Sequence, residues 1–336
     1  MPDELTREGQ RILTLCNACR YCEGYCAVFP ALERRTIFSP DDLNFLANLC
    51  HNCGECYHAC PYTPPHEYAL NVPKTLAQIR TRSYEQYAWP SALARLHRKR
   101  GGALLLAAAV AILGLFFAPR GATFYQVIPH EAMAGVFSAS AVWIAAALAV
   151  GVVRMWGRLP TCGRLSIGLP GFRAALRQAL TQKHMTRGPR RSLHHATFYG
   201  FLLCFASTSV AAFYHFALNW RAPYPYLSLP VVLGTLGGIA MVVGTSGQFW
   251  MKWRQDPALA DASQRGEDQH FIALLWLISV TGLALLAWRE SAAMPALLVI
   301  HLAVVFALFM TMPYGKFVHG IYRLAALIRN AGESTS

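Results

Sequence analysis

The sequence predicts a mainly α-helical protein in which a cysteine-rich soluble region precedes a bundle of six membrane-spanning helices. Composition supports this fold, because the 336 residues have a mean hydropathy of +0.31 and only 14% of them are charged, against about 25% in an average soluble protein. The cysteines support it as well, since eight of the ten lie within residues 16–60. Long apolar runs then dominate residues 101–320.

The composition changes abruptly at Arg98-Lys99-Arg100, and this change marks a domain boundary. We predict a cytoplasmic domain over residues 1–100, a membrane domain over residues 101–325 and a polar C-terminal tail over residues 326–336. The first 15 residues contain acidic side chains and no apolar stretch, so we expect no export signal. Thiols that stay reduced in the cytoplasm and bind metal explain the cysteines better than secreted disulfides do.

Six segments lack Asp, Glu, Lys and Arg and reach the roughly 17–25 residues that a membrane span needs. They are Gly101–Ala118, Ala132–Val153, Ser192–Trp220, Ala222–Met251, Gln269–Trp288 and Ser291–Tyr314. The net charge of +13 could indicate nucleic-acid binding. The basic residues cluster between the apolar spans, however, which favours loops that face anionic lipid.

The loops between the spans alternate in charge. Residues 154–191 hold nine Lys and Arg, whereas the three loops on the opposite side hold one each, namely Arg120, Arg221 and Arg289. By the positive-inside rule, both termini are cytoplasmic, in the inner membrane of a bacterium. Within the long basic loop, Phe172–Lys183 has helical periodicity and is either an interfacial amphipathic helix or an ordinary solvated one.

The eight N-terminal cysteines form two copies of a CxxCxxCxxxC motif. The first copy is Cys16, Cys19, Cys22 and Cys26, and the second is Cys50, Cys53, Cys56 and Cys60. Thiolates are the soft ligands that iron–sulfur clusters require, and in two-cluster proteins the fourth cysteine of each motif ligates the other cluster. We therefore predict two [4Fe-4S] clusters. Cluster 1 is held by Cys16, Cys19, Cys22 and Cys60, and cluster 2 by Cys50, Cys53, Cys56 and Cys26.

Zinc is the alternative reading of these cysteines, but structural zinc motifs use paired CxxC units separated by a long gap. The segment between the two motifs reads SPDDLNFLANL, and it begins with Ser39 and Pro40 before a helical pattern of apolar residues. A helix at this place indicates the helical ferredoxin type of respiratory enzymes. The two remaining cysteines, Cys162 and Cys204, are isolated and receive no role.

Histidines near the ends of two spans are candidate axial haem ligands. His301 and His319 are 18 residues apart in the sixth span. On one helix they share a face and lie about 27 Å apart. The third span offers His194 and His195 at its start and His215 at its end. Helix phase favours His194 over His195 as the companion of His215.

Because the third and sixth spans run antiparallel in this topology, one or two b-type haems are predicted, with two stacked haems favoured. The cytoplasmic-side haem uses His319 with His194 or His195, and the far-side haem uses His215 with His301. The alternative is that each of these residues is an ordinary interfacial histidine. His130, His184 and His270 also lie near span ends and are weaker candidates. Together these histidines predict a cytochrome b-like bundle.

The sequence resembles the tricarballylate-utilisation B family, also called citrate-utilisation B. The resemblance rests on CNACRYCEGYC, CHNCGECYHACPYTPPHEYALNVPK, RRSLHHATFYGFLLCFASTSVAAFYH and HLAVVFALFMTMPYGKFVHGIYR, which follow in order along the chain. The sixth span also resembles the cytochrome b subunit of nitrate reductase, whose His…Pro-aromatic…His frame maps onto His301, Pro313-Tyr314 and His319.

The resemblance implies that the protein reoxidises the flavin of a partner FAD-dependent dehydrogenase, such as a tricarballylate dehydrogenase, and passes electrons to membrane quinone. The chain has no GxGxxG after a strand, so it carries no flavin domain of its own, and no residue indicates catalysis of organic chemistry. Two alternatives remain open. One is a quinol-oxidising subunit that feeds a soluble reductase, and the other is a redox sensor or anchor without turnover.

Overall fold

The computed structural model describes residues 3–98, 109, 124–162, 165–183, 185, 188–259 and 261–333, and these residues contain helices and loops but no strand. The longer helices are α1 (Glu4–Cys19), α3 (Pro40–Leu49), α5 (Val72–Tyr87), α8 (His130–Arg158), α9 (Leu169–Thr181), α10 (Pro189–Leu218), α11 (Leu229–Trp253), α12 (Ala262–Ala287), α13 (Met294–Thr311) and α14 (Val318–Glu333). Short helices are α2 (Val28–Glu33), α4 (Glu55–His58) and α7 (Phe124–Val127), with a 3-10 turn at Pro257–Leu259. The mainly helical fold is confirmed.

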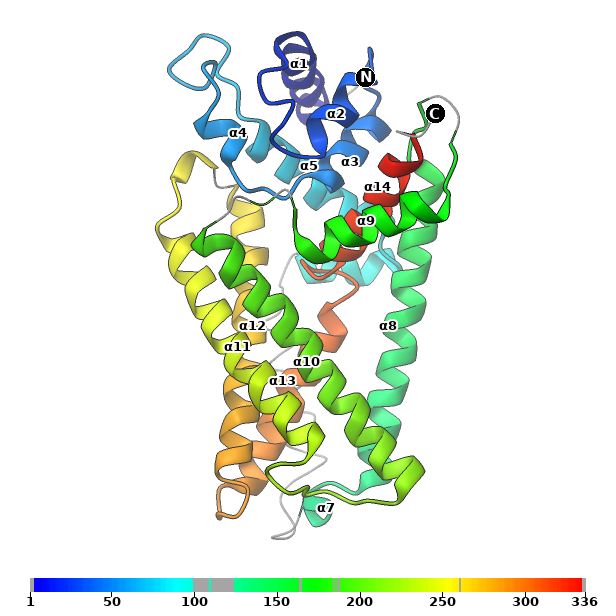
Figure 1. Ribbon diagram of the computed structural model, residues 1–336, viewed down its shortest axis with the longest axis vertical. Helices are drawn as coiled ribbons and strands as arrows, with labels where there is room; N and C mark the ends of the chain where they lie inside the picture. Colours follow the sequence, from blue (N-terminus) through cyan, green and yellow to red (C-terminus); the bar gives the residue numbers. More distant parts are fainter. Residues whose placement is uncertain are drawn as a thin grey trace.

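Five helices in the described ranges are long and apolar enough to cross a membrane, namely α8, α10, α11, α12 and α13. Each coincides with one of the last five predicted spans. The first predicted span, Gly101–Ala118, lies outside the described residues except for Ala109, so the count of six stays a prediction. The five helices run along the long axis of the molecule, and the cysteine-rich region gathers at one end of them (Figure 1).

The predicted helix between the cysteine motifs is α3, and its start is fixed by a capping box. The Ser39 hydroxyl accepts a hydrogen bond from the Asp42 backbone N–H, while an Asp42 carboxylate oxygen accepts one from the Ser39 N–H at 3.0 Å. This reciprocal arrangement satisfies backbone donors that a helix start leaves unpaired. As a result, α3 ends at Leu49 and delivers Cys50 at its C-cap.

The core of the cysteine-rich region continues into the C-terminal part of the chain. Tyr322 on α14 and Met155 on α8 are buried together with side chains of α1, α3 and α5. An ion-pair network adds to this packing, because Arg35 contacts Asp42 at 2.8 Å and Glu333 at 2.9 Å. Residues 326–333, assigned to a polar tail from the sequence, are therefore helical and packed.

The sixth span is shorter than the sequence indicates. α13 ends at Thr311, and a separate helix, α14, begins at Val318. Pro313 explains the break, because proline donates no backbone hydrogen bond and its ring clashes with the carbonyl one turn earlier. The expectation that His301 and His319 lie on one helix is therefore wrong.

The long basic loop contains α9, as the helical pattern at Phe172–Lys183 predicts. α9 lies crosswise near the ends of the membrane helices and packs against α14 (Figure 1). Its Ala175 is buried, whereas Leu169 and Phe172 are exposed. Exposed apolar side chains at this level favour the interfacial helix over the solvated one.

Helices α10 and α11 approach each other through glycines. A Cβ atom added at Gly237 would lie 2.8 Å from the carbonyl oxygen of Gly200 and 2.9 Å from the backbone nitrogen of Cys204. Small residues at such contacts allow membrane helices to pack closely. Cys204, which has no role in the sequence analysis, is thus a small side chain at this interface.

We expect Gly237→Ala to destabilise the protein by about 1–3 kcal/mol, because the added methyl group meets the backbone of α10, which cannot rotate away. Thermal unfolding in detergent measures the effect as a lower Tm. Gly135→Ala on α8 is the matched control, since a Cβ there has no neighbour within 4 Å. Equal Tm values for the two variants would contradict close packing at Gly237.

Candidate redox site

The two cysteine motifs lie in tight turns at one end of the molecule. The first motif begins in α1 and turns at Arg20, which has a φ of 56°. The second turns through Asn52 and Gly54, with φ values of 56° and 86°, before α4. Left-handed backbone of this kind reverses the chain within a few residues. Each motif can therefore direct several thiols toward a common centre.

The fourth cysteine of the second motif lies with the first motif. Burial, together with repulsion from Cys60, Cys22 and Cys19, raises the pKa of Cys16 to about 12. Burial likewise raises the pKa of Cys22 to about 11, with Cys60 as the strongest charged neighbour. The first three cysteines and Cys60 therefore form one group of neighbours.

A second group of neighbouring thiols combines Cys26 of the first motif with cysteines of the second motif. Burial raises the pKa of Cys26 to about 12, and the thiolates that act on it are those of Cys50 and Cys53. Burial also raises the pKa of Cys56, and repulsion from Cys50, Cys26 and Cys53, followed by Cys22, adds to this rise. Crossed ligation requires this grouping, and the ligation itself stays a prediction.

The donors around these thiols suit an iron–sulfur cluster. The backbone N–H of Asn52 donates to Cys50 Sγ at 3.3 Å, and that of Tyr62 donates to Cys60 Sγ at 3.4 Å. Such hydrogen bonds to sulfur tune cluster potentials. Within the described ranges, no three His, Cys, Asp or Glu side chains are arranged to hold a single metal ion.

Three arginines from distant parts of the chain bind the backbone of the second motif and of Leu49, the residue before it. Arg80 on α5 donates to the carbonyl of Cys50 at 2.9 Å, and Arg323 on α14 donates to that of Leu49 at 3.3 Å. Arg190, at the start of α10, donates to the carbonyl of Cys53 at 2.6 Å. Sequence reasoning missed these arginines, because each lies far from the motif along the chain. Their positive charge favours a cluster that accepts an electron.

Three candidate haem histidines lie on α10 and α14, namely His194, His195 and His319. His194 Nδ1 lies 2.7 Å from Gln182 Nε2, whereas His195 Nε2 and His319 Nδ1 are buried without a hydrogen-bond partner among the described residues. Lys316 is close enough to act electrostatically on both His194 and His319. A buried imidazole nitrogen without a partner is energetically costly, and coordination to haem iron is one way to satisfy it.

Burial lowers the pKa of His319 well below its ordinary value, and the charges of Arg80, Lys316 and Arg323 lower it further. The imidazole is therefore neutral at pH 7. The neutral ring is the form that can ligate iron.

At the far end of the bundle, the structure brings together a pair that the sequence did not. The ring of His215 on α10 stacks on that of His130 on α8, with centroids 3.5 Å apart and an angle of 17°. His301 instead lies against α12, where its Nδ1 is 3.0 Å from Thr281 Oγ1. His130 lies just outside its predicted span, and the sequence therefore made it only a weaker candidate ligand.

Comparison with known proteins identifies the family of this chain. Residues 9–95 match the family described as citrate utilization protein B Fer4-like domain, and residues 91–336 match citrate utilization protein B. The chain belongs to the citrate utilization protein B family. A relative named Citrate utilization protein B from Escherichia coli is 44% identical over 351 residues, which cover 97% of this chain and 92% of that protein. No solved structure matches the chain.

Membership of the citrate utilization protein B family fixes the broad character of the chain. The Fer4-like match over residues 9–95 contains all eight motif cysteines and indicates an iron–sulfur electron-transfer role. The five membrane-length helices of the described residues indicate a membrane protein. The family expected from the sequence is thus confirmed.

Proposed function

We propose that this protein reoxidises the reduced flavin of a partner FAD-dependent dehydrogenase, similar to a tricarballylate dehydrogenase, and passes the electrons through two [4Fe-4S] clusters and b-type haem to membrane quinone. One observation carries the proposal. Arg190, at the start of α10, binds the backbone of the second cysteine motif, and His194 and His195 follow one turn later on the same helix. A single helix therefore ties cluster ligands to haem ligands.

The order of the two clusters follows from exposure. Cys19 of the first motif is exposed, and so are the neighbouring Tyr21 and Tyr25. Cys50 of the second motif is buried beneath α5, α10 and α14. We infer that a partner flavoprotein delivers electrons at the first motif and that the second motif passes them toward the membrane.

The haem ligands we propose are His319 with His194 or His195 near the second motif, and His215 with His301 at the far end. The unpaired nitrogens of His195, His215 and His319 support them. A hydrogen bond supports His301 as a ligand. A metal-ligating histidine usually engages its other ring nitrogen in a hydrogen bond, as His301 does with Thr281.

Cofactor analysis of the purified protein tests the proposed function. We expect about eight iron atoms bound to sulfide per chain, and a reduced-minus-oxidised spectrum with b-type haem bands. A reduced FAD-dependent dehydrogenase should then reduce these centres, and a membrane quinone should reoxidise them. A protein that contains clusters but no haem, and that quinone does not reoxidise, would point to a sensor or anchor instead.

Both termini should face the cytoplasm, because they lie at the same end of the molecule (Figure 1) and the basic loop of residues 154–191 faces that end. A fluorescent protein fused after residue 336 should therefore fluoresce, and alkaline phosphatase fused there should be inactive. Alkaline phosphatase fused after Arg221, in the opposite loop, is the matched control and should be active. The opposite pair of results would refute the orientation.

A further inference from the structure

Arg323 on α14 has a buried nitrogen that its known partners leave unused. The side chain is only 5% exposed. Its Nε donates to the carbonyl of Leu49 at 3.3 Å, which fixes the guanidinium next to Cys50, the following residue. Its Nη2 is buried and has no hydrogen-bond partner among the described residues. A buried donor of this kind is costly unless a further group accepts from it.

The other two arginines at the second motif have both terminal nitrogens engaged. Arg190 donates through Nη1 and Nη2 to two carbonyls of the motif, and Arg80 donates through Nη1 to a third carbonyl at 2.9 Å. With the Gln264 amide oriented to suit its neighbours, its side-chain oxygen accepts from Arg80 Nη2 at 2.8 Å. The same oxygen bridges Lys316 Nζ, at 3.0 Å, to Asn52 Nδ2, at 3.3 Å. Of these three arginines, only the one on α14 therefore has a terminal nitrogen without a partner in the described part of the chain.

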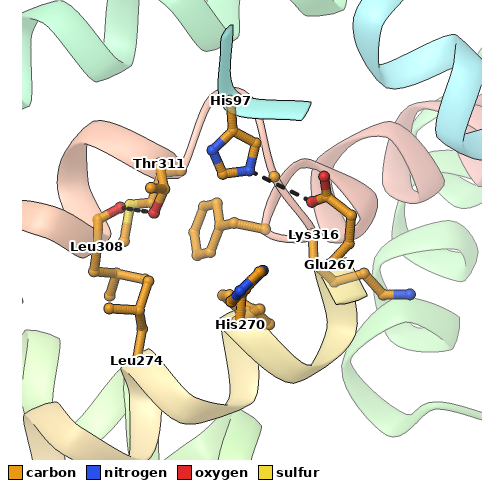
Figure 2. A pocket seen from close by; sticks show the side chains of 11 residues that line it. His97, Glu267, His270, Leu274, Leu308, Thr311 and Lys316 are labelled. Carbon is orange, nitrogen blue, oxygen red and sulfur yellow. Dashed lines mark hydrogen bonds and ion pairs between the residues drawn. The ribbon is translucent and has the colours of Figure 1, made fainter. Parts of the chain in front are cut away.

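The charge of Arg323 is not balanced by a carboxylate. Within the described ranges, no Asp or Glu forms an ion pair with it. The acids at the junction with the membrane helices have other partners, because Asp268 pairs with Lys316 at 2.6 Å and Glu267 lies 3.4 Å from His97 Nε2 (Figure 2). A buried cation is costly without a negative group near it.

Thiolates of the second group supply negative charge near Arg323. Burial lowers the pKa of Arg323, and the charges of Cys26, Cys50 and Cys53 oppose this lowering. All three are predicted ligands of cluster 2. Four thiolates make a [4Fe-4S] cluster an anion, and reduction adds one more negative charge. Such a cluster fits both needs of Arg323, because it balances the guanidinium charge and offers sulfur acceptors to Nη2.

We propose that Arg323 raises the reduction potential of the second cluster by donating a hydrogen bond from Nη2 to one of its sulfur atoms. The proposal rests on the proposed function for the presence of that cluster. When an electron passes from the first cluster to the second, the first is oxidised and the sulfurs of the second become more negative. The bond from the guanidinium is then stronger, which favours the reduced form. No proton moves, because arginine stays charged.

The position of Arg323 on α14 gives this bond a role in electron flow. His319, the candidate ligand of the nearer haem, lies four residues earlier on the same helix. Residues at this spacing share a face and lie about 6 Å apart along the axis. Arg323 therefore favours the electron at the cluster beside the candidate haem ligand.

A redox titration of the full-length protein, followed by electron paramagnetic resonance, tests the proposal. The signal lost in Cys50→Ser identifies the second cluster, whether or not ligation is crossed. Arg323→Gln should make reduction of this cluster about tenfold less favourable, which is a midpoint potential lower by about 59 mV. Arg323→Lys keeps the charge but not the fixed planar donor, so its shift should be smaller. The midpoint of the first cluster should stay unchanged.

Arg329→Gln is the matched control. Arg329 is also buried on α14, but it donates to the carbonyls of Leu159 and Pro160, and its charged neighbours are Glu333 and Arg35. Its replacement should leave both midpoints unchanged. An equal fall in this variant would overturn the inference, because it would show a general effect of disturbing α14.

A measurement on the unsubstituted protein guards against loss of the cluster in Arg323→Gln. Arginine labelled isotopically at its guanidinium nitrogens should show a hyperfine coupling to the reduced second cluster. Arg323→Lys should lose this coupling, and Arg329→Lys should retain it. An unchanged second midpoint, or a coupling that survives Arg323→Lys, overturns the inference and leaves the proposed function standing. If the unsubstituted protein holds no second cluster, the proposed function fails and this inference fails with it.

Discussion

Replacing Cys60 by Ser is expected to destroy the cluster held by the first motif and to spare the one held by the second motif that contains Cys60 itself. The reason is spatial, because Cys60 is the strongest charged neighbour of Cys16 and Cys22. A serine hydroxyl is a harder ligand than a thiolate and binds cluster iron poorly. Iron should fall from about eight to about four atoms per chain.

The reciprocal variant sharpens the test. Cys26→Ser lies in the first motif but should damage the second cluster, because Cys26 lies with Cys50 and Cys53. Electron paramagnetic resonance of the reduced protein distinguishes the two clusters, since each has its own relaxation and potential. Cys162→Ser is the matched control and should keep both signals. If each variant instead lost the cluster of its own motif, the motifs would bind without crossing.

The order of these clusters has a consequence for electron flow. Arg80 and Arg190 donate to backbone carbonyls of the second motif, and Arg323 donates to the carbonyl of Leu49, the residue before it. Burial lowers the pKa of Arg323 to about 10, so it still carries its charge at pH 7. In the proposed function, positive charge beside the second motif would make its cluster the better electron acceptor of the two. Electrons delivered at the exposed first motif would then move toward the membrane helices.

Local signals in the sequence were enough for much of the fold. The cap at Ser39 and Pro40 places α3 correctly, because capping depends only on residues within one turn. The apolar runs place five membrane helices, because length and hydropathy suffice for that purpose. The break at Pro313 was missed, since the apolar run continues to Tyr314 and hides the end of α13. A proline near the end of a span could have signalled it.

Contacts between distant segments could not be read from the sequence. The contact of Arg190 with Cys53 spans 137 residues, and the bridge from Lys316 through Gln264 to Asn52 joins three separate segments. Helix phase describes one helix at a time, so it could not show that His130 on α8 stacks against His215 on α10. An experiment is therefore needed to decide which of the histidines at the same depth in the membrane bind haem.

Replacing His319 or His215 by Ala should each remove one of two haems, lowering the content from about two to about one per chain. In the proposed arrangement His319 ligates the haem beside the second cysteine motif, so its loss should also stop reduction of the remaining haem by the clusters. His215 ligates the far haem in that arrangement, so its loss should leave that reduction intact. Haem quantified by pyridine haemochrome, with iron as a measure of intact clusters, gives both results.

The partner of His215 is decided by two further variants. We expect His301→Ala to lower haem as His215→Ala does, because a hydrogen bond donated by His301 Nδ1–H to Thr281 Oγ1 fixes the ring and leaves its Nε2 for iron. His130→Ala is the control at the same depth and should keep both haems, since its ring must part from His215 before iron could lie between them. Loss of haem in His130→Ala with full haem in His301→Ala would make His130 the ligand. Full haem in all four variants would mean that these histidines are structural and that the two-haem arrangement is wrong.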